Sequence, residues 1–163
     1  KTKEVYHQGN SKYDILRENW YNMLVSMKPT HFLTVQFPKN MRSNSLKVSK
    51  DNLRRLMARF EQCLIGSRWT KSYLPFYAFA EIGPKDGYTH HFHILFNAGI
   101  YTTNALQNAL NDTCIELSLC FETFYLEEIA TYEIIHYCLK DAKVTNYSDD
   151  CDTIILSSNL FNL

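Results

Sequence analysis

The sequence predicts an α+β fold built on one antiparallel sheet. Stretches with apolar residues at helical spacing alternate along the chain with short apolar runs that read as strands. Two of these strands are separated by a segment rich in turn-forming residues, which indicates a hairpin. The chain has 163 residues, 45% of them hydrophobic and 14% aromatic, which is enough for one core. We therefore expect residues 1–163 to form a single domain, which can be a fragment of a longer protein.

The first half of the chain predicts a helix, a strand and a second helix. Residues 10–27 place apolar side chains at helical spacing, and a Lys-Pro dipeptide ends this helix. Residues 31–38 read as a buried strand closed by a proline. A helix over 49–66 follows a polar loop, with Ser49 as its N-cap and Gly66 at its end.

The second half predicts the hairpin and a further helix. Residues 75–82 and 90–97 are the two strands, and the segment "GPKDGYT" between them is typical of a turn. The next stretch, "TTNALQNALNDTC", predicts a helix that begins near Thr102 or Thr103.

A strand and a final helix complete the predicted core. Residues 121–129 read as the strand and residues 130–143 as the helix, while 153–158 predicts either a strand or a terminal arm. The core order is then β-α-β-β-α-β. This is the ferredoxin-like arrangement, an antiparallel sheet with helices packed on one face, here with an extra N-terminal helix and an extra C-terminal helix.

The charge distribution along the chain narrows the classes of protein that the sequence fits. The net charge is zero, but residues 1–76 carry 14 Lys and Arg against 5 Asp and Glu, and residues 77–163 carry 3 against 12. A basic half can bind phosphate beside a carboxylate-rich half.

Five cysteines without a C-x-x-C pair predict reduced thiols. No apolar run reaches the roughly 20 residues of a membrane span, and residues 1–20 lack an export signal.

The predicted hairpin carries a candidate metal site. Side chains two apart in a strand share a face, so His91 and His93 project together while His90 and Phe92 point to the opposite side. Glu81 stands on the partner strand, and a carboxylate on an apolar strand is costly unless it is paired or binds a metal. Two imidazoles and one carboxylate suit a divalent cation. Half-buried histidines hydrogen-bonded to their neighbours are the alternative interpretation.

The final predicted helix carries a candidate nucleophile. Tyr137 and Lys140 are three residues apart and share a face with Glu133 and Asp141. A phenol needs help to lose its proton before it can attack phosphate, and a neighbouring lysine can neutralise the charge that develops. Taken alone, the pair also fits a core tyrosine beside a solvated lysine.

Together these features resemble the HUH endonucleases, and most closely the single-tyrosine replication initiators (Rep) of rolling-circle plasmids and small single-stranded DNA viruses. Those proteins carry three motifs in a fixed order. The threonine-containing strand at 32–38 resembles the first motif, "HFHILF" at 91–96 resembles the metal-binding second motif, and "YCLKD" at 137–141 resembles the nucleophile helix. The resemblance covers residues 31–141.

Two departures separate this chain from other branches of that superfamily. Relaxases usually have a third histidine after the pair and an N-terminal tyrosine, and neither pattern is present. Single-tyrosine transposases share the motif order but usually lack the lysine of Y-x-x-K, so they remain an alternative. No G-x-x-x-x-G-K-[ST] signature occurs, so a helicase domain would lie outside this chain.

The resemblance implies a metal-dependent endonuclease that nicks single-stranded or hairpin origin DNA to start rolling-circle replication. Glu81, His91 and His93 would hold Mg²⁺ or Mn²⁺. Tyr137 would form a covalent 5′-phosphotyrosine link, and Lys140 would steady the charge that develops. The partners implied are origin DNA and a helicase domain or host replication proteins, in the cytoplasm for a plasmid or phage protein and in the host nucleus for a viral one.

The basic half supplies candidates for DNA contacts. They are Arg42, Lys47, Lys50, Arg54, Arg55, Arg59, Arg68 and Lys71. Trp69 and Tyr73 lie among them and could stack on bases. A solvated basic helix face is the alternative. A non-enzymatic ferredoxin-like module is the rival function, with Phe79, Phe92 and Phe96 stacking on bases from the sheet.

Overall fold

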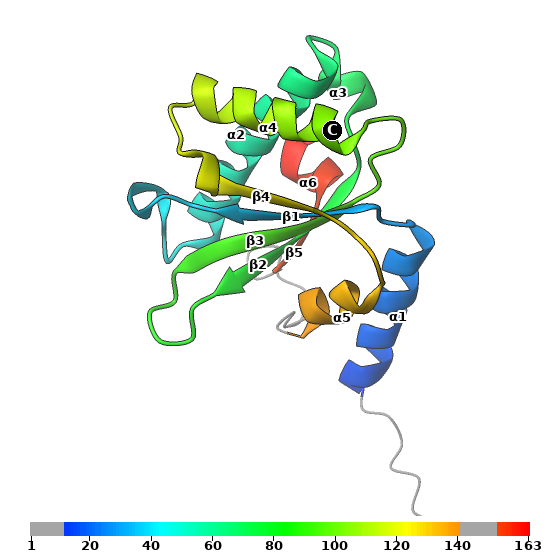
Figure 1. The fold of residues 1–163 in the computed structure, drawn as a ribbon. Coiled ribbons are helices and arrows are strands. Elements are labelled where there is room, and N and C mark those ends of the chain that lie inside the picture. The colour runs from blue at the N-terminus through cyan, green and yellow to red at the C-terminus, as the bar shows by residue number, and fades with distance from the viewer. Residues whose placement is uncertain (1–11, 141–152) are drawn as a thin grey trace, which may run out of the picture.

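The computed structural model describes residues 12–140 and 153–163, and it confirms an α+β fold (Figure 1). The elements in chain order are α1 (Lys12–Ser26), β1 (His31–Gln36), the 3-10 helix η1 (Lys39–Met41), α2 (Leu46–Ile65), α3 (Trp69–Ser72), β2 (Phe76–Ile82), β3 (Thr89–Phe96), α4 (Thr103–Glu116), the 3-10 helix η2 (Phe121–Thr123), β4 (Phe124–Glu128), α5 (Glu133–Leu139), β5 (Ile154–Leu156) and α6 (Ser157–Phe161).

The five strands form one antiparallel sheet in the order β4-β1-β3-β2-β5. β3 lies at the centre and pairs with β1 on one side and β2 on the other. The connection from β1 to β2 contains α2, and the connection from β3 to β4 contains α4. The predicted hairpin is confirmed, because β2 and β3 pair directly and Gly83 donates its backbone N–H to the carbonyl of Tyr88.

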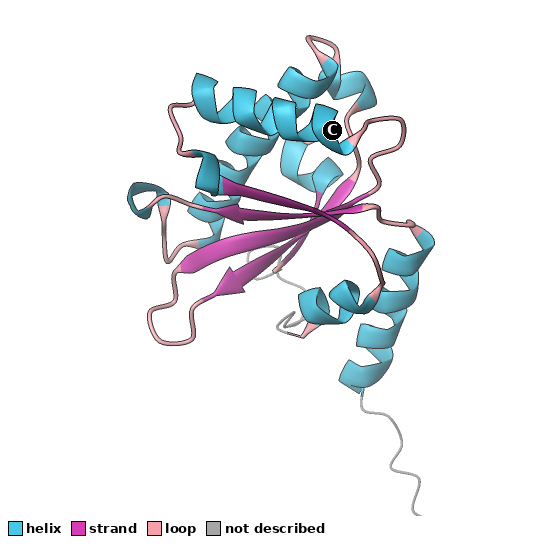
Figure 2. Ribbon diagram, in the orientation of Figure 1, coloured by secondary structure: helices cyan, strands magenta, loops and turns pink. Residues whose placement is uncertain are grey.

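Helices cover both faces of the sheet (Figure 2). The larger core lies between the sheet and α2 and α4, where Val35, Phe92 and Phe60 are almost completely buried. A smaller apolar cluster lies on the other face, where Leu24 of α1 and Ile135 of α5 pack against the sheet. The predicted one-sided packing therefore holds for α2 and α4, and the two extra helices occupy the opposite face.

The predicted start of the second helix needed correction. The N-cap of α2 is Ser45, whose Oγ accepts from the N–H of Val48, and Ser49 instead lies buried inside the helix. The helix starts at Leu46, because the Ser45 side chain already satisfies a backbone N–H of its first turn. Gly66 ends α2 with φ +98°, as predicted, because glycine tolerates a positive φ.

The predicted elements after the hairpin are confirmed in outline. Thr102 caps α4 by accepting from the N–H of Ala105. Within the segment 153–158, Ile154–Leu156 form the strand β5, which confirms the strand alternative for these residues, and α6 begins at Ser157. The last three residues of the predicted 130–143 helix lie outside the described residues.

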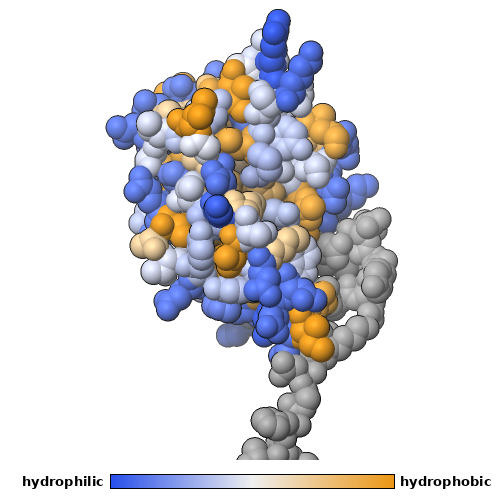
Figure 3. Space-filling model, turned by 90° about the vertical axis from the view of Figure 1, so that its right-hand side faces the viewer, coloured by the Kyte–Doolittle hydropathy of each residue, from blue (hydrophilic) through white to orange (hydrophobic). Residues whose placement is uncertain are grey.

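The surface on the side of α1 mixes residue types. Hydrophobic residues lie in separate groups among hydrophilic ones when the molecule is viewed from that side (Figure 3). Among the helices described over 12–140 and 153–163, none has the length and apolar character to span a bilayer.

The core contains one buried carboxyl group. Glu61 of α2 is fully buried, and its Oε2 accepts from the backbone N–H of Leu74 at 3.1 Å, while Oε1 has no hydrogen-bond partner. Burial raises the pKa of Glu61 to about 8, against the opposing effect of the Leu74 hydrogen bond. The side chain is therefore mostly protonated at neutral pH.

This burial predicts a pH dependence of stability. The pKa of Glu61 is higher in the folded state than its ordinary 4.5, so the folded state is favoured at low pH and loses stability as the pH rises toward about 8. We expect this group to lower the free energy of unfolding by about 1.4 kcal/mol per pH unit across that window, and Glu61→Gln to remove the loss.

Urea unfolding at about pH 5.5 and about pH 7.5 measures the effect. The exposed Glu127 provides the matched control Glu127→Gln, which should keep the wild-type pH dependence. An equal pH dependence in wild type and Glu61→Gln would show that Glu61 is not the group responsible.

Candidate active site

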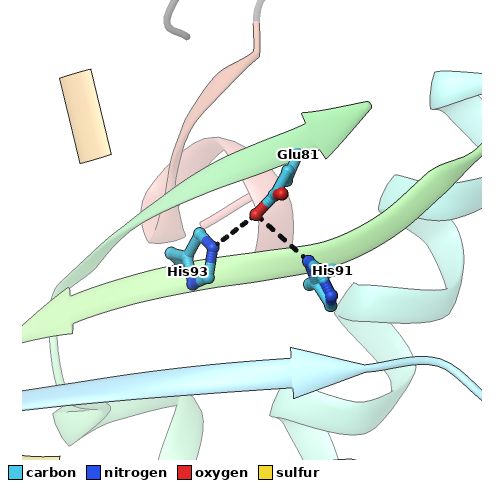
Figure 4. Close-up of side chains that lie close together, drawn as sticks. All are labelled: Glu81, His91 and His93. Carbon is cyan, nitrogen blue, oxygen red and sulfur yellow. Dashed lines mark hydrogen bonds and ion pairs between the residues drawn. The ribbon is translucent and has the colours of Figure 1, made fainter. Parts of the chain in front are cut away.

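Strand register brings the three predicted metal ligands together. Glu81 of β2 pairs directly with His91 of β3, and His93 lies two residues further along the same face. The β2–β3 register shifts immediately after Glu81, an irregularity of a kind that is common beside functional sites. Figure 4 shows the carboxylate directed toward both imidazoles.

The three side chains are in direct contact. Glu81 Oε2 lies 3.1 Å from His91 Nδ1 and 2.7 Å from His93 Nε2. One ligand atom from each residue can be chosen so that all three lie within 4.8 Å of one another. Solvent reaches 35% of the Glu81 side chain and 30% of His91, but only 11% of His93. The group therefore has one sheltered side and one side open to a ligand.

The carboxylate of the group is ionised. Partial burial acts to raise the pKa of Glu81, but hydrogen bonds from His93 and His91 and their positive charge outweigh it and hold that pKa below its ordinary value. The carboxylate is therefore ionised at neutral pH. An ionised carboxylate with two imidazole nitrogens is a donor set that could hold a metal ion.

His93 is fixed by β1 in a way that the sequence analysis did not identify. Thr34 pairs with His93 across the strands, and its Oγ1 lies 3.3 Å from His93 Nδ1. Phe32 stacks on the same imidazole at 5.3 Å between ring centroids and an interplanar angle of 16°. In the hydrogen bond to the ionised Glu81 carboxylate Nε2 carries the proton, and a bound cation would replace that proton while Nδ1 keeps its contact with Thr34. The β1–β3 register was the signal that could have revealed this role.

His90 is separate from this group, as predicted. Its Nε2 lies 3.2 Å from Asp86 Oδ2 in the hairpin turn. The turn is tight there, since a Cβ on Gly83 would come within 2.5 Å of His90 Nε2 and within 2.4 Å of Asp86 Oδ1. His90 and Asp86 therefore shape the turn.

The predicted nucleophile lies against the imidazole of His93. Tyr137 is 41% exposed, and its ring lies edge-on to His93 with the centroids 5.4 Å apart and an interplanar angle of 70°. Lys140 Nζ lies 4.3 Å from the centroid of the Tyr137 ring. The structure thus brings together the three proposed ligands and both predicted catalytic residues. Glu133 begins the same helix, and Asp141 lies outside the described residues.

The short helix α5 is anchored to α1 and the sheet. Ile135, Cys138 and Leu139 are buried in the smaller cluster, and burial raises the pKa of the Cys138 thiol to about 12. His136, the neighbour of Tyr137, stacks on Tyr21 of α1 at 4.2 Å between centroids and an angle of 9°. This stacking was not predicted, because nothing in the sequence indicates that α1 and α5 share a face of the sheet.

The predicted basic residues lie elsewhere. Five of the eight are on α2, which packs against the face of the sheet opposite to Glu81. Lys71 lies on α3, and Arg68 is the N-cap of that helix. Arg54 pairs with Asp51 and Arg59 with Glu116. Arg42 donates from Nε to the carbonyl of Phe37. The structure therefore does not gather these residues around Tyr137.

The aromatic residues of the rival interpretation are not available to bases. The exposed fraction is 3% for Phe79, 0% for Phe92 and 2% for Phe96. Buried rings cannot stack on nucleotides, so these three phenylalanines do not form a base-stacking platform.

Comparisons with protein-family models, curated proteins and solved structures give no match. The inference about function therefore rests on the geometry of Glu81, His91, His93, Tyr137 and Lys140.

The Tyr21–His136 stacking leads to a prediction about the position of α5. Tyr21→Ala should lower the free energy of unfolding by about 1 kcal/mol and increase amide exchange across Glu133–Leu139, because an aromatic pair that holds this helix is lost. Tyr21→Phe keeps the ring and should behave as wild type. Tyr125→Ala, at an exposed position on β4, is the matched control. Unchanged exchange in α5 of Tyr21→Ala would contradict the anchoring role.

Proposed function

We propose that this protein is a metal-dependent endonuclease that nicks single-stranded DNA through a covalent phosphotyrosine. The observation that carries the proposal is the position of the Tyr137 ring beside His93, within the same group as Glu81 and His91. A partly exposed phenol next to a metal-ligand set and a lysine is the combination that phosphoryl transfer to tyrosine requires. The proposed class is the single-tyrosine HUH replication initiator.

Strand topology supports the finer fold assignment within this proposal. The order β4-β1-β3-β2, with α2 and α4 in the two connections that lead into β2 and β4, has the connectivity of a ferredoxin-like core. In this interpretation β5 extends the sheet beside β2, and α1 and α5 are additions on the opposite face.

The proposed cofactor is Mg²⁺ or Mn²⁺, held by Glu81, His91 and His93. The donor set fits, because one ionised carboxylate and two imidazoles are adjacent and one side of the group is open. Such an ion, when bound, polarises a phosphate oxygen and stabilises the charge that develops on it. Thr34 supports the site through its contact with His93 Nδ1, which holds the imidazole ring in place.

The chain's own residues carry the proposed chemical step. The Tyr137 oxygen attacks the scissile phosphorus, a bond from tyrosine to the 5′-phosphate forms, and the bond from phosphorus to the 3′ oxygen breaks. The phenolic proton is lost to solvent and the released 3′ oxygen gains a proton, so the step is neutral overall. The phosphotyrosine bond conserves the energy of the phosphodiester, so the reverse step joins a 3′-hydroxyl to the bound end.

Lys140 assists this step in the proposal. Its ammonium lies over the Tyr137 ring, where a positive charge stabilises the extra negative charge on the phosphate in the transition state. The lysine also favours a replication initiator over a single-tyrosine transposase, in which the Y-x-x-K lysine is usually absent. The released 3′-hydroxyl would then prime rolling-circle synthesis from an origin presented as a single strand or a hairpin.

The nucleophile can be tested by trapping the covalent product. A pool of single-stranded oligonucleotides with a randomised centre, labelled at the 3′ end, is incubated with the protein and Mn²⁺ and analysed on a denaturing protein gel. We expect a labelled adduct with wild type and none with Tyr137→Phe, because the tyrosine stays on the 5′-phosphate of the labelled fragment. Tyr132→Phe, at the N-cap of the same helix, is the matched control and should keep the adduct. An adduct that persists in Tyr137→Phe would exclude this nucleophile.

The metal requirement is tested separately. We expect Glu81→Ala and His93→Ala to abolish cleavage of the same oligonucleotides, since each removes a ligand, while Glu127→Ala on the surface leaves it unchanged. EDTA should stop the wild-type reaction and added Mn²⁺ should restore it. Cleavage that continues in EDTA would show that the reaction does not use this site.

A further inference from the structure

A groove follows α2 on the side of the sheet away from Tyr137. One hollow of about 600 Å³ lies between α2 and the β5–α6 segment, and a second of about 520 Å³ lies between α2, α3 and α6. Asp51 and Arg54 line both hollows, so the two adjoin along the helix. We refer to them together as the α2 groove.

The α2 side of the groove is positively charged. Lys47, Lys50 and Arg54 line the larger hollow at spacings of three and four residues, which places them on one face of the helix. Arg55 adds a fourth cation in the smaller hollow. Asp51 is the one acidic residue among those that line the described groove, and it pairs with Arg54 at 3.3 Å in an exposed position. Among the described side chains that line the groove, four are cationic and one is acidic.

The other side of the groove offers apolar and aromatic contacts. Ile155 and Leu160 line the larger hollow, and Trp69 and Phe161 line the smaller one. Trp69 is partly exposed and contacts Phe161 edge to face, with centroids 5.0 Å apart. A row of cations beside an accessible indole is the combination by which proteins hold a single strand: charges follow the phosphates and an aromatic ring takes a base.

We propose that the α2 groove binds single-stranded DNA, with Lys47, Lys50, Arg54 and Arg55 along the phosphates and Trp69 against a base. This inference rests on the proposed function, because it assigns the groove to the same DNA strand that Tyr137 cleaves. Of the eight basic residues picked out in the sequence, it selects the four that line the α2 groove.

The sheet edge connects the groove to the proposed active site. β5 forms a wall of the larger hollow and is also the edge strand paired with β2. Ile154 pairs with Phe79, which stands two residues before Glu81 on β2. β5 is therefore an element that adjoins both the groove and the strand that carries Glu81.

Binding can be measured without cleavage. A fluorescein-labelled oligo-dT is titrated with Tyr137→Phe protein in EDTA, and anisotropy gives Kd over a range of salt concentrations. The additional changes Lys47→Glu and Arg55→Glu, one in each hollow, should weaken binding about tenfold or more. They should also reduce the salt dependence of log K by about 1.4, since two phosphate contacts are lost. Lys28→Glu with Lys39→Glu makes the same charge change at exposed lysines outside the groove and should change Kd less than about twofold.

An equal loss in both double variants would overturn the proposal, because it would show a response to total charge alone. Unchanged DNA affinity in the Lys47→Glu, Arg55→Glu variant would also overturn the proposal. That result would leave the proposed nucleophile untouched, because the covalent-adduct assay tests Tyr137 separately. A poly-glutamate peptide that competes as well as oligo-dT would exclude DNA as the specific occupant. In a Trp20→Phe background Trp69 is the single indole, and oligo-dT should quench its fluorescence.

Discussion

The antiparallel register of β2 and β3 is the constraint on which the candidate site depends. It places Glu81 opposite His91 and turns both, with His93, toward the face covered by α1 and α5. A shift of the β2 register by one residue would turn each β2 side chain to the other face of the sheet. Glu81 would then enter the apolar core beneath α2, and the imidazoles would lose their carboxylate. Pairing with β1 adds the second constraint, since Thr34 and Phe32 fix the ring of His93. The site is therefore a product of sheet pairing, and α5 brings only the tyrosine and lysine to it.

Local patterns were enough to predict much of this arrangement. The period-two spacing of His91 and His93, the turn residues before them and the apolar strand around Glu81 led to the ligand group, and the end of α2 at Gly66 followed from glycine chemistry. Features that depend on long-range packing were missed. The contact of Thr34 with His93 requires the β1–β3 register, and the stacking of Tyr21 on His136 requires α1 and α5 to share a face. The wrong N-cap at Ser49 has a local cause, because two serines four residues apart are equivalent capping candidates in sequence.

The sheet separates two surfaces of different chemistry. One face presents Glu81, His91, His93 and Tyr137, and the other supports α2 with its row of cations. The opposite charges of the two halves of the chain follow this division in part, since α2 belongs to the basic half and the metal ligands and α5 to the acidic half. In the proposed function the two surfaces have separate tasks: α2 holds the strand by its phosphates, and the ligand group with Tyr137 acts on one of them. The edge strand β5 is the element that adjoins both.

The coordination of one cation by the paired imidazoles is the part of the account that everything else in the function requires. Pulsed electron paramagnetic resonance of the protein loaded with a substoichiometric amount of Mn²⁺ tests it most directly, because the spectrum reports nitrogen nuclei bonded to the ion. We expect couplings from two imidazole nitrogens in the wild type and from one in a variant that lacks either His91 or His93. A spectrum of Mn²⁺ with no nitrogen coupling would show that the two histidines and Glu81 only hydrogen-bond to one another.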